Sequence, residues 1–87
     1  MNTKELCSLT GYSYPELTEN NRTERVSTAR HAVCYILRSK YELTPREIGC
    51  EIQRIRTTVI HSIKRFGELL EVRDRQAVEI FKKMVLC

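Results

Sequence analysis

Apolar residues recur at helical spacing in two neighbouring segments of the chain. In the first segment, Ile48 and Ile52 lie four positions apart. In the second segment the intervals are four, three and four positions, at Val59, Ile63, Phe66 and Leu70. Each segment therefore has one apolar stripe and one polar face, which predicts two amphipathic helices that share a core.

The first of these helices has a well-specified start. Thr44 is suited to cap it, Pro45 suits its first position, and Glu47 completes a capping box. A short basic connection leads to the second helix, which opens with one basic and two hydroxyl side chains: Arg56, Thr57 and Thr58. Two helices in this arrangement are typical of a helix-turn-helix, here over about 44–70, whose second helix presents side chains to a DNA groove.

The polar face that remains holds seven residues, and none of them is acidic: Arg54, Arg56, Thr57, Thr58, His61, Lys64 and Arg65. Side chains and backbone N–H groups at a helix N-terminus can meet phosphate, and the next positions can meet base edges. Arginine suits guanine O6 and N7, and a threonine methyl suits the thymine methyl. His61 is also compatible with a packing role on the helix surface.

The segments before this motif predict further helices. A first helix over 3–10 ends at Gly11 and precedes a short helical turn around 14–17. Residues 18–27 are polar and predict an exposed loop. Ser27 or Thr28 is expected to cap a central helix that extends to about Lys40. Its apolar positions recur at helical spacing: Ala29, Ala32, Val33, Ile36 and Leu37.

The segment after the motif predicts a last helix over 73–87. Its expected core stripe consists of Ala77, Val78, Phe81, Met84 and Val85. Together these elements predict an all-α fold, a single domain over 1–87 with five to six helices and a Trp-repressor-like helix-turn-helix. The tyrosines are expected to be structural, because no aromatic cluster interleaves with the arginines.

Charge is unevenly distributed along the 87 residues. The chain has 15 basic and 11 acidic residues, a formal charge of +4. Residues 22–65 hold ten basic side chains against four acidic ones, a net charge of +6, and the remainder has a net charge of −2. Positive charge therefore gathers where the helix-turn-helix is expected, which suits a polyanionic partner. Simple solvation of helix surfaces is the alternative explanation.

Other classes of function find little support. The cysteines, Cys7, Cys34, Cys50 and Cys87, form no CxxC pair, and we expect reduced thiols rather than a zinc site with His31 and His61. No phosphate-binding GxxxxGK[ST] loop, signal peptide or membrane-spanning run occurs, so we expect no nucleotide, no membrane contact and a cytoplasmic location. No defensible catalytic arrangement appears, and we expect neither an enzyme nor a cofactor.

The residues of the motif resemble those of a known family, the C-terminal DNA-binding domain of the bacterial replication initiator DnaA. That signature has Ile-Gly, a glycine-rich turn, Arg-Asp-His-Thr-Thr-Val, an apolar residue and His-Ala. This chain has Ile48-Gly49 and then Arg54-Ile55-Arg56-Thr57-Thr58-Val59-Ile60-His61-Ser62. The match extends outward to Ala29-Arg30-His31-Ala32 and to Thr44-Pro45-Arg46-Glu47.

The resemblance implies binding of double-stranded DNA and suggests roles for individual residues. The expected base-reading residues are Ile55, Arg56, Thr57, Thr58 and His61. The expected contacts to the phosphate backbone are Arg22, Arg25, Arg30, Arg38, Thr44, Pro45, Arg46, Arg54, Lys64 and Arg65. Replication or transcription proteins are possible further partners.

The chain departs from the family's signature at several positions. Ile55 and Arg56 replace its aspartate and histidine, and the turn is one residue short, with Gln53 where glycine is expected. Thr28 stands where the family places an arginine that enters the minor groove. These departures motivate an alternative function, a degenerate helical domain that acts as a protein-protein interaction module.

Overall fold

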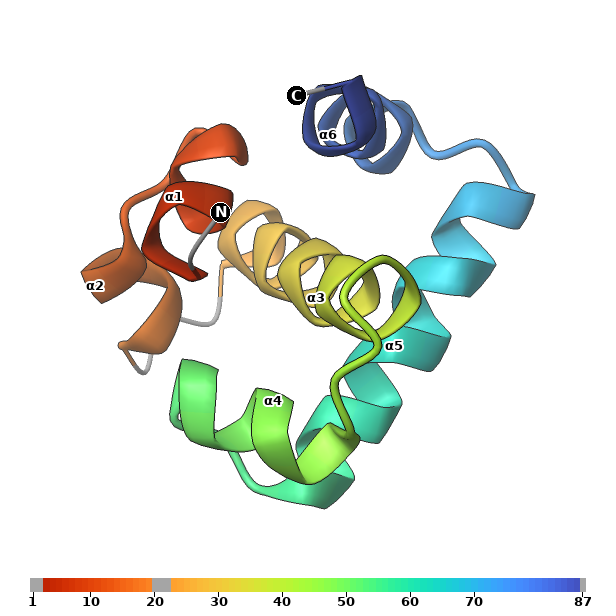
Figure 1. The fold of residues 1–87 in the computed structure, drawn as a ribbon. Coiled ribbons are helices and arrows are strands. Elements are labelled where there is room, and N and C mark those ends of the chain that lie inside the picture. Colours follow the sequence, from red (N-terminus) through yellow and green to blue (C-terminus); the bar gives the residue numbers. More distant parts are fainter. Residues whose placement is uncertain (1–2, 20–22, 87) are drawn as a thin grey trace.

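The computed structural model describes residues 3–19 and 23–86, and within these ranges it contains helices and no strands. The six helices are α1 (Thr3–Leu9), α2 (Tyr14–Thr18), α3 (Glu24–Ser39), α4 (Pro45–Ile52), α5 (Arg56–Glu71) and α6 (Arg75–Leu86). Figure 1 shows that α3 runs through the middle of the molecule and that the other helices surround it. The predicted all-α class is confirmed.

The central helix α3 is the main contributor to the core. The apolar positions predicted for it are all buried, as are Val26 and Cys34. Each of the other five helices packs against α3. Because one 16-residue helix contacts all the others, its sequence determines how α4 and α5 are placed relative to α1, α2 and α6.

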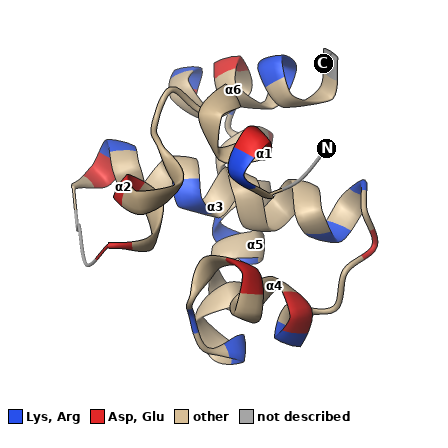
Figure 2. Ribbon diagram, turned by 60° about the vertical axis from the view of Figure 1, so that its left-hand side comes forward, with Lys and Arg blue, Asp and Glu red and all other residues tan. Residues whose placement is uncertain are grey.

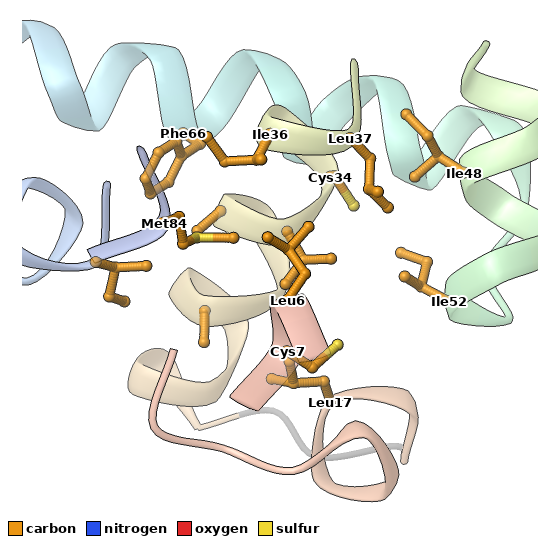
Figure 3. Packing of buried hydrophobic residues seen from close by; sticks show 14 of the residues in the cluster. Leu6, Cys7, Leu17, Cys34, Ile36, Leu37, Ile48, Ile52, Phe66 and Met84 are labelled. Carbon is orange, nitrogen blue, oxygen red and sulfur yellow. The ribbon is translucent and has the colours of Figure 1, made fainter. Parts of the chain in front are cut away.

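The surrounding helices close the core with apolar side chains that point toward α3 (Figure 3). These buried residues are Leu6, Cys7, Leu17, Ile48, Ile52, Val59, Phe66, Ala77, Ile80 and Met84. Tyr35 packs against the rings of Phe66 and Phe81, with centroid distances of 5.3 and 6.2 Å. The Tyr14 hydroxyl donates a hydrogen bond to the Glu51 carbonyl at 2.6 Å, so both tyrosines are structural.

The start of α3 differs from the prediction. The helix begins at Glu24 with Thr23 as its N-cap residue, so the predicted cap at Ser27 or Thr28 is wrong. The predicted loop over 18–27 is wrong at Thr18 and over 24–27, which are helical, and its residues 20–22 lie outside the described residues. The reason for the earlier start of α3 is Val26, which is buried and extends the apolar stripe of α3 by almost one turn. Arg25 consequently lies in the first turn of α3 rather than on a loop.

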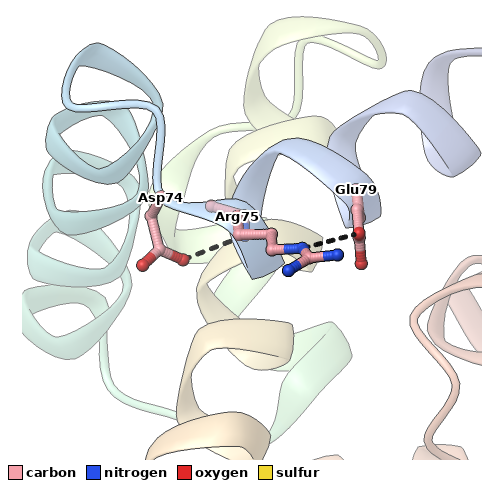
Figure 4. Close-up of polar contacts among 4 residues, drawn as sticks. Asp74, Arg75 and Glu79 are labelled. Carbon is pink, nitrogen blue, oxygen red and sulfur yellow. Dashed lines mark hydrogen bonds and ion pairs between the residues drawn. The ribbon is translucent and has the colours of Figure 1, made fainter.

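The last helix also differs in its start and in its buried face. It begins at Arg75 and follows Arg73, whose backbone is in the left-handed region with φ of 55°. Asp74 caps the helix, because its carboxylate accepts a hydrogen bond from the Ala77 N–H at 3.1 Å (Figure 4). Arg75 forms an exposed ion pair with Glu79 at 3.5 Å. The buried positions of α6 are Ala77, Ile80 and Met84, whereas Val78 and Phe81 are half-buried and Val85 is exposed. The predicted stripe omitted Ile80 and wrongly included Val85.

Candidate nucleic-acid interface

The first helix of the motif begins as its sequence predicts. The Glu47 N–H donates to the Thr44 hydroxyl at 3.2 Å, and the Thr44 N–H donates to the Glu47 carboxylate at 3.0 Å. Hydrogen bonds from Thr44 lower the pKa of Glu47. Pro45 occupies the first turn, where its missing N–H has no consequence. The capping box therefore defines where α4 starts.

The connection between α4 and α5 is unusually close. The Arg54 N–H donates to the Gly49 carbonyl at 2.9 Å, and a Cβ on Gly49 would overlap the Arg54 carbonyl oxygen. Gln53 turns the chain in the left-handed conformation, with φ of 58° and ψ of 48°. Glycine adopts this conformation most easily, so the structure explains why glycine is expected at this position.

The Arg54 side chain binds the protein itself. Its guanidinium donates to the Thr18 carbonyl at 2.9 Å and to the Glu19 carbonyl at 2.7 Å. The side chain is half-buried, so it lies off the exposed basic face on which it was predicted. Arg54 thus connects the turn of the helix-turn-helix to the end of α2.

Arg30 is also placed differently from the prediction. It was expected near the polar side of its helix, but it is 9% exposed, and its Nε donates to the Leu17 carbonyl at 2.7 Å. Burial and the neighbouring charge of Arg54 lower the pKa of Arg30. The guanidinium groups of Arg30 and Arg54 therefore meet consecutive carbonyls at the end of α2, and the expectation that Arg30 faces solvent is wrong.

The structure brings the remaining predicted residues of the second helix onto one exposed surface. Its members are Arg56, Thr57, Thr58, His61, Lys64 and Arg65, all on α5 and all exposed. We call this set the α5 surface. No acidic residue occurs between 52 and 67. Figure 2 shows basic segments around the connection from α4 to α5, whereas acidic segments lie on α4 itself. The α5 surface is therefore positively charged close to the turn.

The N-terminus of α5 adds partial positive charge to this surface. Its N-cap residue, Ile55, makes no side-chain capping hydrogen bond, and the first turn contains no acidic residue. The first N–H groups of a helix have no acceptor within the helix, and the helix dipole is positive at this end. These groups thus remain suited to a phosphate or another anion. By contrast, α2 and α4 have capping boxes.

The other predicted phosphate contacts lie on different elements. Arg46 is exposed in the first turn of α4, near Thr44 and Pro45. Arg25 and Arg38 are exposed near opposite ends of α3, about 20 Å apart at 1.5 Å per residue. The Arg38 guanidinium donates to the Leu43 carbonyl at 3.2 Å. Arg22 lies outside the described residues.

A groove of about 620 Å³ borders the α5 surface and was not anticipated from the sequence. It is lined by His31, Thr58, Ile60, His61, Ser62, Lys64, Arg65 and Glu68. Burial, together with the positive charges of Arg30 and Arg65, lowers the pKa of His31 to about 4. Its buried Nδ1 has no hydrogen-bond partner. His31 is therefore an uncharged packing residue at pH 7. The residues around it in the sequence did not indicate that it would be buried.

Three of the four cysteines, all with free thiols, lie in the part of the chain that the structure describes. Cys7 and Cys34 are buried, and burial raises their pKa values to about 11 and about 12, while Cys50 is exposed. Cys87 lies outside the described residues. Within residues 3–19 and 23–86, no group of three or more His, Cys, Asp or Glu side chains is placed to hold a metal ion. No helix in that part of the chain is long and apolar enough to cross a membrane.

The geometry of α4 and α5 agrees with the comparison to known proteins. Residues 3–66 match the family described as "Bacterial dnaA protein helix-turn-helix". The chain belongs to the bacterial DnaA helix-turn-helix family. The match to the DnaA family extends from α1 to Phe66 in α5, so α6 lies beyond it. The resemblance inferred from the signature is thereby confirmed.

One similar relative is the "Chromosomal replication initiator protein DnaA" of Mycoplasma pneumoniae. It is 33% identical to this chain over 70 residues, which are 80% of the chain and 16% of the relative. The chain thus spans a small part of the length of that DnaA protein. No solved structure is significantly similar to the chain.

Proposed function

We propose that this chain binds double-stranded DNA sequence-specifically through the helix-turn-helix of α4 and α5. Its role would be in replication initiation, in the regulation of initiation, or in transcription regulation. The main support is the α5 surface, which is exposed and consists of basic and polar side chains, with one acidic neighbour, Glu68, 4.0 Å from Arg65. It begins at a helix N-terminus that has no side-chain cap. Membership of the DnaA family adds independent support for DNA as the partner.

In this proposal α5 lies in the major groove with its N-terminal turn deepest. Arg56 offers a fork of donors to guanine O6 and N7, and Thr57 and His61 reach neighbouring base edges. Thr58 and the N–H groups of the first turn meet phosphate oxygens at the groove edge. Lys64 and Arg65 lie one to two turns further along and bind the backbone by charge, where position matters less than for base contacts.

The first helix of the motif supplies contacts on the flank of α5. Thr44 and the backbone next to Pro45 start α4, and Arg46 extends from the same turn. Arg25 and Arg38 on α3 are candidates for more distant phosphates, as is Arg22. Arg54 and Arg30 have a different role in the proposal: they hold the end of α2 against the motif and contact no DNA.

Fluorescence anisotropy tests this proposal with two duplexes, one carrying the DnaA family's consensus box and one with a scrambled sequence. Several salt concentrations are used, since phosphate contacts release counterions and make binding weaken with salt. Clear preference for the box supports sequence-specific binding with the family's target, whereas equal binding to both would keep the phosphate contacts but mean that Ile55 and Arg56 read another sequence. Absence of binding to either favours the protein-interaction module.

Two variants locate the binding surface. Replacing Arg56 with alanine is expected to weaken specific binding by about 5- to 100-fold, the range for losing one good base contact. Arg75→Ala is the matched control, because Arg75 is an exposed arginine on α6 whose side chain is 94% exposed. Equal weakening by both variants would contradict the assignment of the α5 surface.

A further inference from the structure

Two large apolar side chains are exposed in the first two turns of α5, where polar groups would be expected. Ile55 is 71% exposed and Ile60 is 44% exposed. Ile55 is the N-cap residue, a position that favours short polar side chains such as serine or aspartate. Neither isoleucine belongs to the hydrophobic core, and Ile55 forms no side-chain cap.

Both isoleucines lie among charged and polar groups. Helical periodicity places Ile60 beside Thr57 and Lys64, three positions before and four after it on the same face. Ile55 directly precedes Arg56 and the uncapped N–H groups of the first turn. No acidic residue occurs between 52 and 67. An occupant of this surface must thus combine negative charge with small exposed apolar groups.

The major groove of DNA offers this combination. Its phosphates supply the negative charge, and the C5 methyl group of thymine is the apolar group that its base pairs expose there. An isoleucine side chain has no hydrogen-bonding atom, so it can distinguish bases in the groove only by apolar contact or by steric exclusion. A purely apolar protein partner would leave the surrounding cations without counter-charges.

We propose that Ile55 and Ile60 are specificity-determining residues that contact thymine C5 methyl groups, so that the preferred DNA site has thymine next to the guanine bound by Arg56. This inference rests on the proposed function and adds the base class that the site selects. It assigns roles to Ile60, which sequence reasoning did not single out, and to Ile55, whose mode of base contact the sequence did not define.

Replacement of thymine by uracil tests the inference, since it removes only the C5 methyl group. The preferred duplex is first selected from a randomised library with the full chain, and each thymine in it is then replaced singly. At one or more positions we expect about 3- to 10-fold weaker binding, because one buried methyl group contributes roughly as much as one methylene. The scale of this effect is well within the resolution of anisotropy titrations.

Variants assign each methyl contact to a side chain. In Ile55→Ala or Ile60→Ala, the thymine-to-uracil effect at the contacted position should fall to less than about twofold, the normal scatter between independent sites. Val72→Ala is the matched control, because Val72 is 75% exposed at the opposite end of α5. It should retain the full uracil effect. An unchanged melting temperature shows that each variant is folded.

The remaining outcomes overturn the inference in distinguishable ways. A selected site without thymine beside the guanine, or uracil effects that persist in both isoleucine variants, would refute methyl contact while leaving DNA binding intact. Failure to select any duplex, with no salt-dependent binding to bulk DNA, would instead refute the proposed function on which the inference rests.

Discussion

The backbone of Arg54 lies directly against Gly49, so closely that no side chain fits between them. The Arg54 N–H donates to the Gly49 carbonyl, and its own carbonyl oxygen occupies the place of a Cβ on residue 49. The neighbouring atom is backbone and cannot rotate away. This contact determines how closely α5 follows α4, and through it the position of the α5 surface.

Substitution of Gly49 by alanine should therefore destabilise the domain. We expect a loss of about 1–3 kcal/mol in the free energy of unfolding, typical of overpacking a buried position. Urea denaturation measures it. Cys50→Ala, at the adjacent exposed position, is the control and should change stability by less than about 0.5 kcal/mol. If Gly49→Ala were as stable as the control, the close contact between Gly49 and the Arg54 backbone would be refuted.

Substitution of Gln53 by glycine should have the opposite effect. The left-handed conformation costs a non-glycine residue roughly 1–2 kcal/mol, partly offset by the greater freedom of glycine in the unfolded chain. A net gain of about 0.5–1 kcal/mol is expected in the same denaturation assay. Gln53→Ala keeps a Cβ and should give no such gain. Destabilisation by the glycine variant would show that Gln53 contributes an interaction that offsets its conformation.

Replacement of Arg54 separates a structural role from a phosphate contact. Arg54→Met keeps much of the side-chain volume but leaves the Thr18 and Glu19 carbonyls without their donor, so we expect a loss of about 1–2 kcal/mol in stability. Below the melting transition, the slope of log affinity against log salt should remain that of the wild type. If the slope instead becomes shallower by about one unit, the change expected for one lost phosphate contact, Arg54 binds a phosphate.

The pH dependence of stability should reveal His31. Its pKa is lowered from 6.5 to about 4 in the folded chain, so well above pH 6.5 it is neutral in both states and has no effect. Between pH 6.5 and about 4 the unfolded chain takes up a proton that the folded chain does not, and stability falls as the pH falls. Denaturant titrations from pH 7.5 to 4 measure this fall.

Comparison with His31→Gln isolates this contribution from other titrating groups. The variant should lose part of the wild-type decline, whereas His61→Gln, at an exposed position, should retain it. A decline of equal steepness in wild type and His31→Gln would mean that His31 accepts a proton in the folded chain as readily as in the unfolded one.

The sequence predicted most of the helices because their apolar periodicity and caps are local signals. Thr44 and Glu47 identify the start of α4 from four consecutive residues, and the stripe of α3 identifies its buried face. The start of α3 was missed because the polar residues around Val26 resemble a loop when read without the core that buries Val26. Local pattern does not show which apolar residue a neighbouring helix will cover.

The sequence predicted the exposed position of those candidate side chains that lie together on one helix. Arg56, Thr57, His61 and Lys64 share a face of α5 by periodicity alone. Arg30 and Arg54 were misplaced because their partners are backbone carbonyls of α2, distant in sequence. An arginine that binds a carbonyl and one that binds phosphate look the same in a sequence, so only the tertiary structure separates them.

The most direct test of the central claim, that the α5 surface binds duplex DNA, is a backbone amide NMR titration of the chain with the preferred duplex. If the α5 surface binds DNA, the largest chemical-shift changes are expected at residues 55–65 and in the first turn of α4, with small changes in α6. Largest changes on α1 or α6, or no changes at all with duplex in excess, would contradict it.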